Sequence, residues 1–127
     1  MNYNEVNEKL KQLKIEDYIW VIYVGIIFLS WLSNSYERDY FINNNEKSKE
    51  NYRQILIIIF SILVIIYGYF LYDSYKSVRD LKPWQSNKAK ELNYLSFLAS
   101  LFIFISGIIL LYIAYEDEQL NVEIAFN

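Results

Sequence analysis

The chain has no cysteine and no histidine, and it has only three glycines and one proline among 127 residues. The absence of cysteine excludes disulfides, thiolate metal sites and thiol nucleophiles, and the absence of histidine removes the commonest metal ligand and general base. Three dispersed glycines cannot form a glycine-rich phosphate loop. We therefore expect a protein that is not an enzyme and that holds no cofactor and no metal.

Basic charge is also scarce. The net charge is −3 and the pI is about 4.9, which gives no electrostatic footprint for nucleic acid. Near the C-terminus, Glu116, Asp117, Glu118 and Glu123 are oxygen ligands of the type that Ca²⁺ uses, but such a cluster in a tail is more typical of a solvated segment. No pattern in the sequence indicates a small-molecule substrate.

Three long stretches lack charge altogether: residues 18–36, 54–72 and 92–115. At about 1.5 Å per helical residue they reach roughly 28, 28 and 36 Å, against a hydrocarbon core of about 30 Å. Inside lipid each backbone group must be satisfied within its own segment, so each stretch is expected to be a helix. A soluble fold of this size cannot enclose three helices that are apolar all round. The sequence predicts an all-α membrane protein with three transmembrane helices, and the lipid bilayer as its first partner.

The three stretches divide the chain into an amphipathic segment at residues 1–17, expected in the cytoplasm, a membrane domain of three spans at 18–115 and an acidic tail at 116–127, expected outside. The first stretch has the length of a signal peptide core, and Ser33-Asn34-Ser35 is small at both ends of a three-residue step. Glu16 and Asp17 stand where a basic flank is wanted, however, and Trp31 and Leu32 are bulky beside the cleavage position. A retained span is therefore the favoured interpretation.

Lysine and arginine are unequally distributed between the two sides of the membrane. Residues 1–17 and the second loop together hold eight, whereas the first loop and the C-terminal tail together hold four. By the positive-inside rule the N-terminus and second loop are cytoplasmic and the C-terminus is outside. We expect a multi-pass protein of the plasma membrane with this orientation.

The N-terminal segment has apolar residues at helical spacing, namely Tyr3, Val6, Leu10 and Leu13. Two interpretations fit this pattern equally well. One is an amphipathic helix that lies along the inner membrane surface, and the other is a helix that simply extends the first span.

Small residues recur at the spacing of a helix packing face. They occur seven apart in the third span and again in the second span, and one glycine lies in the first. In lipid, small residues let helix backbones approach closely, so we expect helix contacts there, within one chain or between copies. The predicted packing residues are Gly25, Ser61, Gly68, Ser96, Ser100, Gly107 and Ala114.

Aromatic residues gather where the second span would leave the membrane. Tyr69, Tyr72 and Tyr75, with Trp84 in the following loop, are predicted to anchor the helix at the inner interface. The basic loop around them fits the ordinary positive-inside pattern better than a dedicated site for anionic lipid, because Asp73, Asp80 and Glu91 offset part of its charge.

The last residues alternate between apolar and other side chains, which is the period of a half-buried strand. The pattern predicts a short C-terminal strand that finds an edge in the first loop or in another chain, and a disordered tail is the alternative. The predicted contact residues are Leu120, Val122, Ile124 and Phe126.

No predicted span contains an aspartate, glutamate, lysine or arginine, which argues against an ion-coupled transporter. The serines of the third span do not form a continuous polar stripe, although a narrow oligomeric channel stays open as an alternative. The expected function is therefore that of a non-catalytic membrane protein that acts through helix and tail contacts with itself or another membrane protein, as accessory, immunity or defence-type components do. The alternative is a homo-oligomeric pore.

Overall fold

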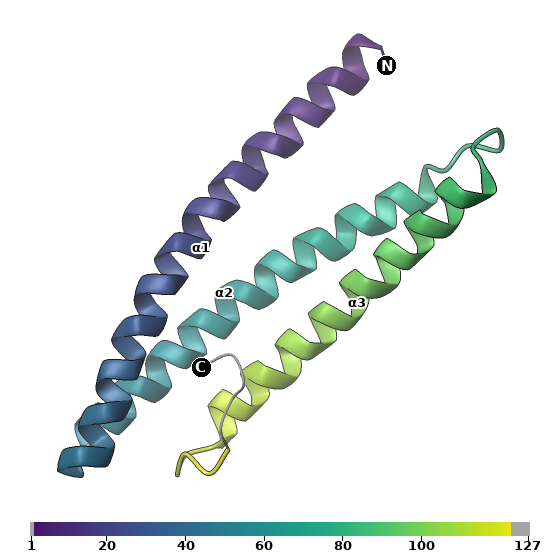
Figure 1. Ribbon diagram of the computed structural model, residues 1–127. Coiled ribbons are helices and arrows are strands. Elements are labelled where there is room, and N and C mark those ends of the chain that lie inside the picture. The colour runs from purple at the N-terminus through teal and green to yellow at the C-terminus, as the bar shows by residue number, and fades with distance from the viewer. Residues whose placement is uncertain (1, 123–127) are drawn as a thin grey trace.

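The computed structural model describes residues 2–122, and these form three long helices (Figure 1). They are α1 (Tyr3–Asn43), α2 (Glu46–Arg79) and α3 (Asn87–Glu116). At about 1.5 Å per residue they are roughly 61, 51 and 45 Å long, and each is long and apolar enough to cross a membrane. The prediction of an all-helical protein with three candidate membrane spans is confirmed.

Side-chain caps explain where each helix begins. Asn2 accepts a hydrogen bond from the N–H of Glu5, whose carboxylate accepts from the N–H of Asn2, so α1 opens with a capping box. Asn45 caps α2, and Ser86 caps α3 by accepting from the N–H of Ala89. α1 ends at Asn43, and its C-cap Asn44 takes the left-handed conformation with φ 55°.

The N-terminal segment does not form a helix of its own. α1 runs without interruption from Tyr3 to Asn43, so the predicted amphipathic pattern belongs to the first turns of the same helix that carries the first apolar stretch. Of the two interpretations, the structure has the helix that extends the first span.

α2 lies in the middle of the molecule. It packs antiparallel to α1 on one side and to α3 on the other, whereas the described parts of α1 and α3 make no backbone contact with each other. Figure 1 shows α2 and α3 running side by side while α1 leans away from them toward its N-terminus. The three helices therefore do not close into a bundle.

We refer to the end that holds the turn Asn44-Asn45 as the turn end, and to the end that holds residues 80–86 and the N-terminus as the loop end. The best buried side chains lie toward the turn end, where Ile26 of α1 and Ala114 of α3 meet α2. Phe60 and Ile59 of α2 form the centre of this core, each with about 1% of its surface exposed. Packing thus holds the helices together most firmly at the turn end.

The predicted C-terminal strand is not supported, because residues 2–122 contain no strand. After α3 the Asp117 carboxylate accepts hydrogen bonds from the backbone N–H groups of Asn121 (2.9 Å) and Val122 (2.8 Å). Leu120 adopts a left-handed conformation with φ 55°, which an extended strand does not allow. The chain therefore bends at the start of the predicted strand. Ile124 and Phe126 lie outside the described residues.

Candidate functional site

The contact between α2 and α3 is built around two glycines. A Cβ atom at Gly107 would lie 3.0 Å from Tyr67 Cδ2 and 3.4 Å from Val64 Cγ2, so this glycine lets α3 approach α2 closely. A Cβ at Gly68 would lie 3.4 Å from the ring of Phe104, an ordinary contact distance. Close approach between these two helices therefore depends on Gly107 more than on Gly68.

The other predicted packing residues of these helices contribute unequally. Ala114 is buried in the core, and Ser61 is half-buried. Ser100 shares a hydrogen bond of 2.8 Å with Ser74 of α2, which the sequence did not single out. Ser96 is exposed and lines a cavity. Ser74 falls just after the second apolar stretch, so a search restricted to the apolar residues had no signal to find it.

Gly25 is placed differently from the other two glycines. It lies on an exposed face of α1, and a Cβ atom there would meet nothing within 4 Å. Its neighbours Val24 and Phe28 are 52% and 62% exposed. Gly25 therefore makes no helix contact within the described part of this chain.

The predicted interface aromatics lie along the loop end. Tyr72, Tyr75 and Trp84 are exposed by 58%, 48% and 80%, while Tyr69 is half-buried. Tyr75 also faces the ring of Phe97 on α3, with 6.3 Å between ring centroids. Tyr75 thus contributes to helix packing as well as to the exposed surface.

At the turn end, side chains of α2 hold the end of α3. Arg53 donates from Nη2 to the backbone oxygen of Tyr115 at 3.0 Å, and its Nη1 pairs with Glu50 at 3.2 Å. The last turn of α3 carries no basic residue of its own. Arg53 therefore supplies the positive charge that the C-terminal carbonyls of a helix favour.

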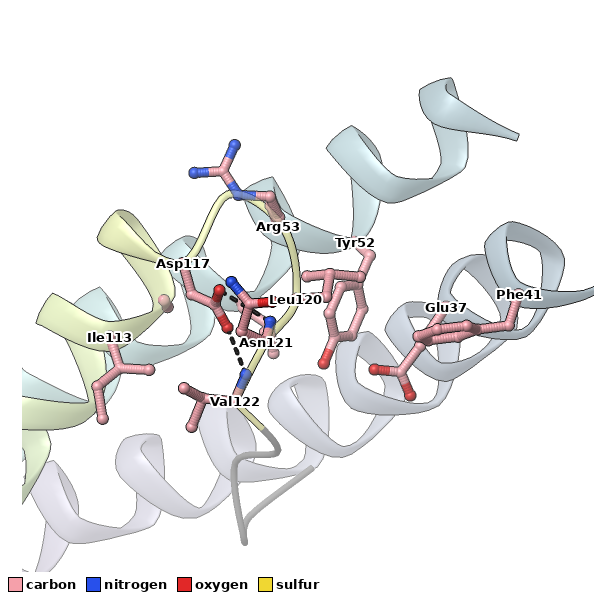
Figure 2. Close-up of a pocket in the computed structure, with 11 residues that line it drawn as sticks. Glu37, Phe41, Tyr52, Arg53, Ile113, Asp117, Leu120, Asn121 and Val122 are labelled. Atoms are coloured by element: carbon pink, nitrogen blue, oxygen red, sulfur yellow. Dashed lines mark hydrogen bonds between the residues drawn. The ribbon is translucent and has the colours of Figure 1, made fainter. Parts of the chain in front are cut away.

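A cavity of about 330 Å³ lies beside this contact, and we call it the tail cavity (Figure 2). Figure 2 shows the Glu37 carboxylate and the Tyr52 hydroxyl pointing toward one another across it. Of the predicted tail contacts, Leu120 packs against the core, whereas Val122 lines the cavity with 52% of its surface exposed. The described tail thus folds back onto the helices through Leu120.

The turn between α1 and α2 is organised by a single carboxylate. Asp39 accepts hydrogen bonds from the amide of Asn43 (2.6 Å), the amide of Asn45 (3.0 Å) and the hydroxyl of Ser48 (2.5 Å). These hydrogen bonds, that from Ser48 first, hold the pKa of Asp39 below its ordinary value. Asp39 was not among the predicted site residues, because nothing in a linear pattern shows that three donors surround it.

Two further cavities lie at the loop end. The first, of about 390 Å³, lies among the hydroxyls of Ser74, Ser96 and Ser100, and we call it the serine cavity. The second, of about 510 Å³, is lined by Lys9 and Lys11 of α1 and Lys76 of α2, and we call it the lysine cavity. Asp73 lines both cavities, so they are neighbours on either side of this residue.

Asp73 also connects α1 to α2 near the loop end, where the two helices stand apart. Its Oδ2 accepts a hydrogen bond of 2.6 Å from Gln12 Nε2. The neighbouring residue, Ser74, contacts Ser100, which lies eight residues beyond the start of the third apolar stretch. Asp73 is therefore level with the apolar part of α3, although along its own helix it follows the apolar stretch.

Comparison with known proteins adds no relationship: no protein-family model, no curated protein and no solved structure matches this chain.

Proposed function

We propose that this chain is a non-catalytic protein of the plasma membrane that acts by packing α1 against a helix of another copy or of a different membrane protein. The observation that carries the proposal is the open surface at Gly25. In lipid, where no hydrophobic force drives helices together, small residues at a surface allow the close backbone contact that stabilises association. Gly25 offers such a surface, and a Cβ atom built there would meet no other atom within 4 Å in the described chain.

The arrangement of the helices supports the same proposal. Within the described residues α1 has backbone contacts with α2 and none with α3, so much of its surface is left for other molecules. Large apolar side chains of α1, among them Val21, Ile27 and Trp31, are 65–69% exposed. Lipid covers such a face by default, and a glycine within it provides a place where a second helix can replace lipid. The tail, with Val122 exposed beside the tail cavity, offers a second contact.

Purification in a mild detergent from the native host tests this proposal. The wild-type chain should be recovered as an oligomer or together with another membrane protein. Gly25→Leu should reduce that recovery severalfold with no loss of thermal stability, because a side chain there meets open space in the single chain. Val24→Leu is the matched control, since it enlarges an exposed neighbour that is already branched and should leave recovery unchanged.

Two results would contradict the proposal. One is recovery of the wild-type chain as a monomer with no other protein. The other is equal recovery of the partner with Gly25→Leu, which would place the contact elsewhere. Conduction by a ring of copies in a planar bilayer would favour the alternative function, a homo-oligomeric pore.

A further inference from the structure

The serine cavity has one charged group in its lining, the carboxylate of Asp73. Three aromatic rings, from Tyr23 of α1 and from Tyr67 and Phe70 of α2, form another part of the lining. The cavity therefore combines a negative charge with ring faces, and both attract cations. Among residues 2–122 no basic side chain lines it, so this part of the chain offers no positive charge to balance an anion.

The carboxylate of Asp73 has capacity to bind a ligand. Gln12 donates to its Oδ2 at 2.6 Å, and a carboxylate has about four acceptor positions on its two oxygens. Gln12 also holds the side chain in place, because it links α1 to α2 at this level. The hydroxyls of Ser74 and Ser100 bond to each other at 2.8 Å and can still accept or donate one bond more.

Asp73 follows the second apolar stretch directly and stands between Tyr72 and Tyr75, which are predicted to lie at the inner interface. The contact of Ser74 with Ser100 also brings Asp73 level with the apolar stretch of α3. Ionisable side chains beside the apolar region of a membrane protein are candidates for ligand or ion sites. The lysine cavity continues from Asp73 toward the charged first turns of α1, and it connects the site to the loop end.

The lining selects among cations. Ca²⁺ takes six to eight oxygen ligands and Mg²⁺ takes six in strict geometry, and one carboxylate with a few hydroxyls does not supply either set. An organic ammonium instead requires a single counter-charge and aromatic faces around its alkyl groups. A volume of about 390 Å³ is within the range of small-molecule sites and can hold such a group.

We propose that the serine cavity binds an organic ammonium group, with the Asp73 carboxylate as counter-charge and the rings of Tyr23 and Tyr67 against its alkyl substituents. Such a group reaches the cavity from two sources, a free amine in water or the amine of a phospholipid headgroup. The inference does not depend on the proposed role of Gly25, which lies on another face of α1.

Isothermal titration of the purified chain in a maltoside detergent tests the proposal. The probes are choline chloride, for a free ammonium, and short-chain phosphatidylethanolamine, for a lipid headgroup, with sodium chloride and short-chain phosphatidylglycerol as controls without an amine. Saturable binding of choline and of the amine lipid means that a free cation suffices. Binding of the amine lipid alone assigns the headgroup as the ligand. If neither amine probe binds, or if phosphatidylglycerol binds as tightly as the amine lipid, the proposal is wrong.

Variants then locate the binding. Asp73→Asn keeps the size of the side chain and should weaken amine binding about tenfold or more, while Asp73→Glu should retain most of it. Tyr23→Leu removes one aromatic ring from the cavity and should weaken amine binding severalfold. Because Tyr23 lies on a different helix from Asp73, this variant still tests the site if Asp73→Asn folds poorly. Glu91→Gln removes an exposed carboxylate outside the cavity and should have no effect. If Asp73→Asn and Tyr23→Leu both bind the amine probes as tightly as the wild type does, the proposal is wrong.

Discussion

Asp39 shows how one side chain organises the connection between two helices. Its Oδ1 accepts from Asn43, and its Oδ2 accepts from both Asn45 and Ser48. Asn45 in turn caps α2 through the N–H groups of Lys47 and Ser48. The carboxylate thus joins the last turn of α1, the two-residue turn and the first turn of α2.

This arrangement predicts a specific dependence on pH. Aspartate has an ordinary pKa of about 3.9, and the hydrogen bonds lower the pKa of Asp39 in the folded chain. As the pH falls below about 4, the unfolded chain takes up the proton first, so the stabilisation is present above that pH and is lost below it. Asp39→Asn should lower the thermal midpoint at pH 7 and make it less sensitive to acid, because the amide turns an N–H₂ group toward donors.

Thermal unfolding in detergent between pH 7 and pH 3 measures this effect. Asp80→Asn is the control, because Asp80 is an exposed aspartate at the other end of α2, beside Arg79. If Asp39→Asn and the wild type lose the same thermal stability over this range, the hydrogen-bond network does not stabilise the turn.

A second residue-scale prediction concerns Gly107. Gly107→Leu would force a bulky side chain into the ring of Tyr67, 3.0 Å from the position of its Cβ, and should destabilise the chain by about 1–3 kcal/mol. Ile108→Leu, on a neighbouring exposed face, should be nearly silent. Thermal or denaturant unfolding in detergent compares the two variants, and equal stability would remove Gly107 from the helix contact.

At the scale of elements, the sequence predicts the helices well because long apolar runs dominate every other signal. It does not show which faces meet. Gly25, Gly68 and Gly107 carry the same local signal, yet an added Cβ would meet a neighbour at 3.0 Å at Gly107, at 3.4 Å at Gly68 and at no distance under 4 Å at Gly25, because contact depends on how the helices are rotated and spaced. The prediction of a C-terminal strand rests on alternation alone, and at residues 121 and 122 the backbone N–H groups instead donate hydrogen bonds to the Asp117 carboxylate.

Contacts between elements are the part of the site that sequence reasoning missed. Arg53 belongs to the charged first turns of α2. Its position in the sequence gives no indication that it contacts Tyr115, 62 residues later at the end of α3. Asp73 likewise follows the second apolar stretch, and only the antiparallel pairing with α3 places it level with Ser100. Both residues flank the apolar stretch 54–72, so an inspection of the apolar stretches alone does not include them.

The contact of Arg53 gives a prediction for the turn end. Its side chain is 14% exposed, and it donates to the backbone oxygen of Tyr115. Arg53→Met keeps much of the length of the side chain and removes the charge, and it should cost about 1.5–3 kcal/mol, the typical value of a hydrogen bond to a charged group. Unfolding in detergent measures the loss, with hydrogen exchange to show that α3 frays first at its C-terminal end.

Arg79→Met is the matched control for this variant. Arg79 pairs with its neighbour Asp80 at 3.2 Å, and its side chain is 51% exposed, so the pair contributes little. Should Arg53→Met unfold at the same denaturant concentration as Arg79→Met, the contact with Tyr115 does not hold the end of α3.

On the scale of the whole molecule, the apolar stretches of the three helices lie at the same level, and so do their charged ends. The turn Asn44-Asn45 and the loop at residues 80–86 reverse the chain, so the three apolar stretches lie beside one another between two charged ends. Their lengths and positions allow one bilayer to cover all three stretches at once. This layout, in which α2 lies between α1 and α3, underlies both the proposed helix contact at Gly25 and the proposed ammonium site at Asp73.

We propose that the chain crosses the membrane three times with its N-terminus in the cytoplasm. Because the chain has no cysteine, single cysteines at Asn44 and at Gln85 report the two ends without background. We predict that a membrane-impermeant thiol reagent labels Asn44→Cys in intact cells, and labels Gln85→Cys only after the cells are opened. Labelling of Gln85→Cys with protection of Asn44→Cys would show the inverted orientation. Labelling of both in intact cells would contradict a membrane span between them.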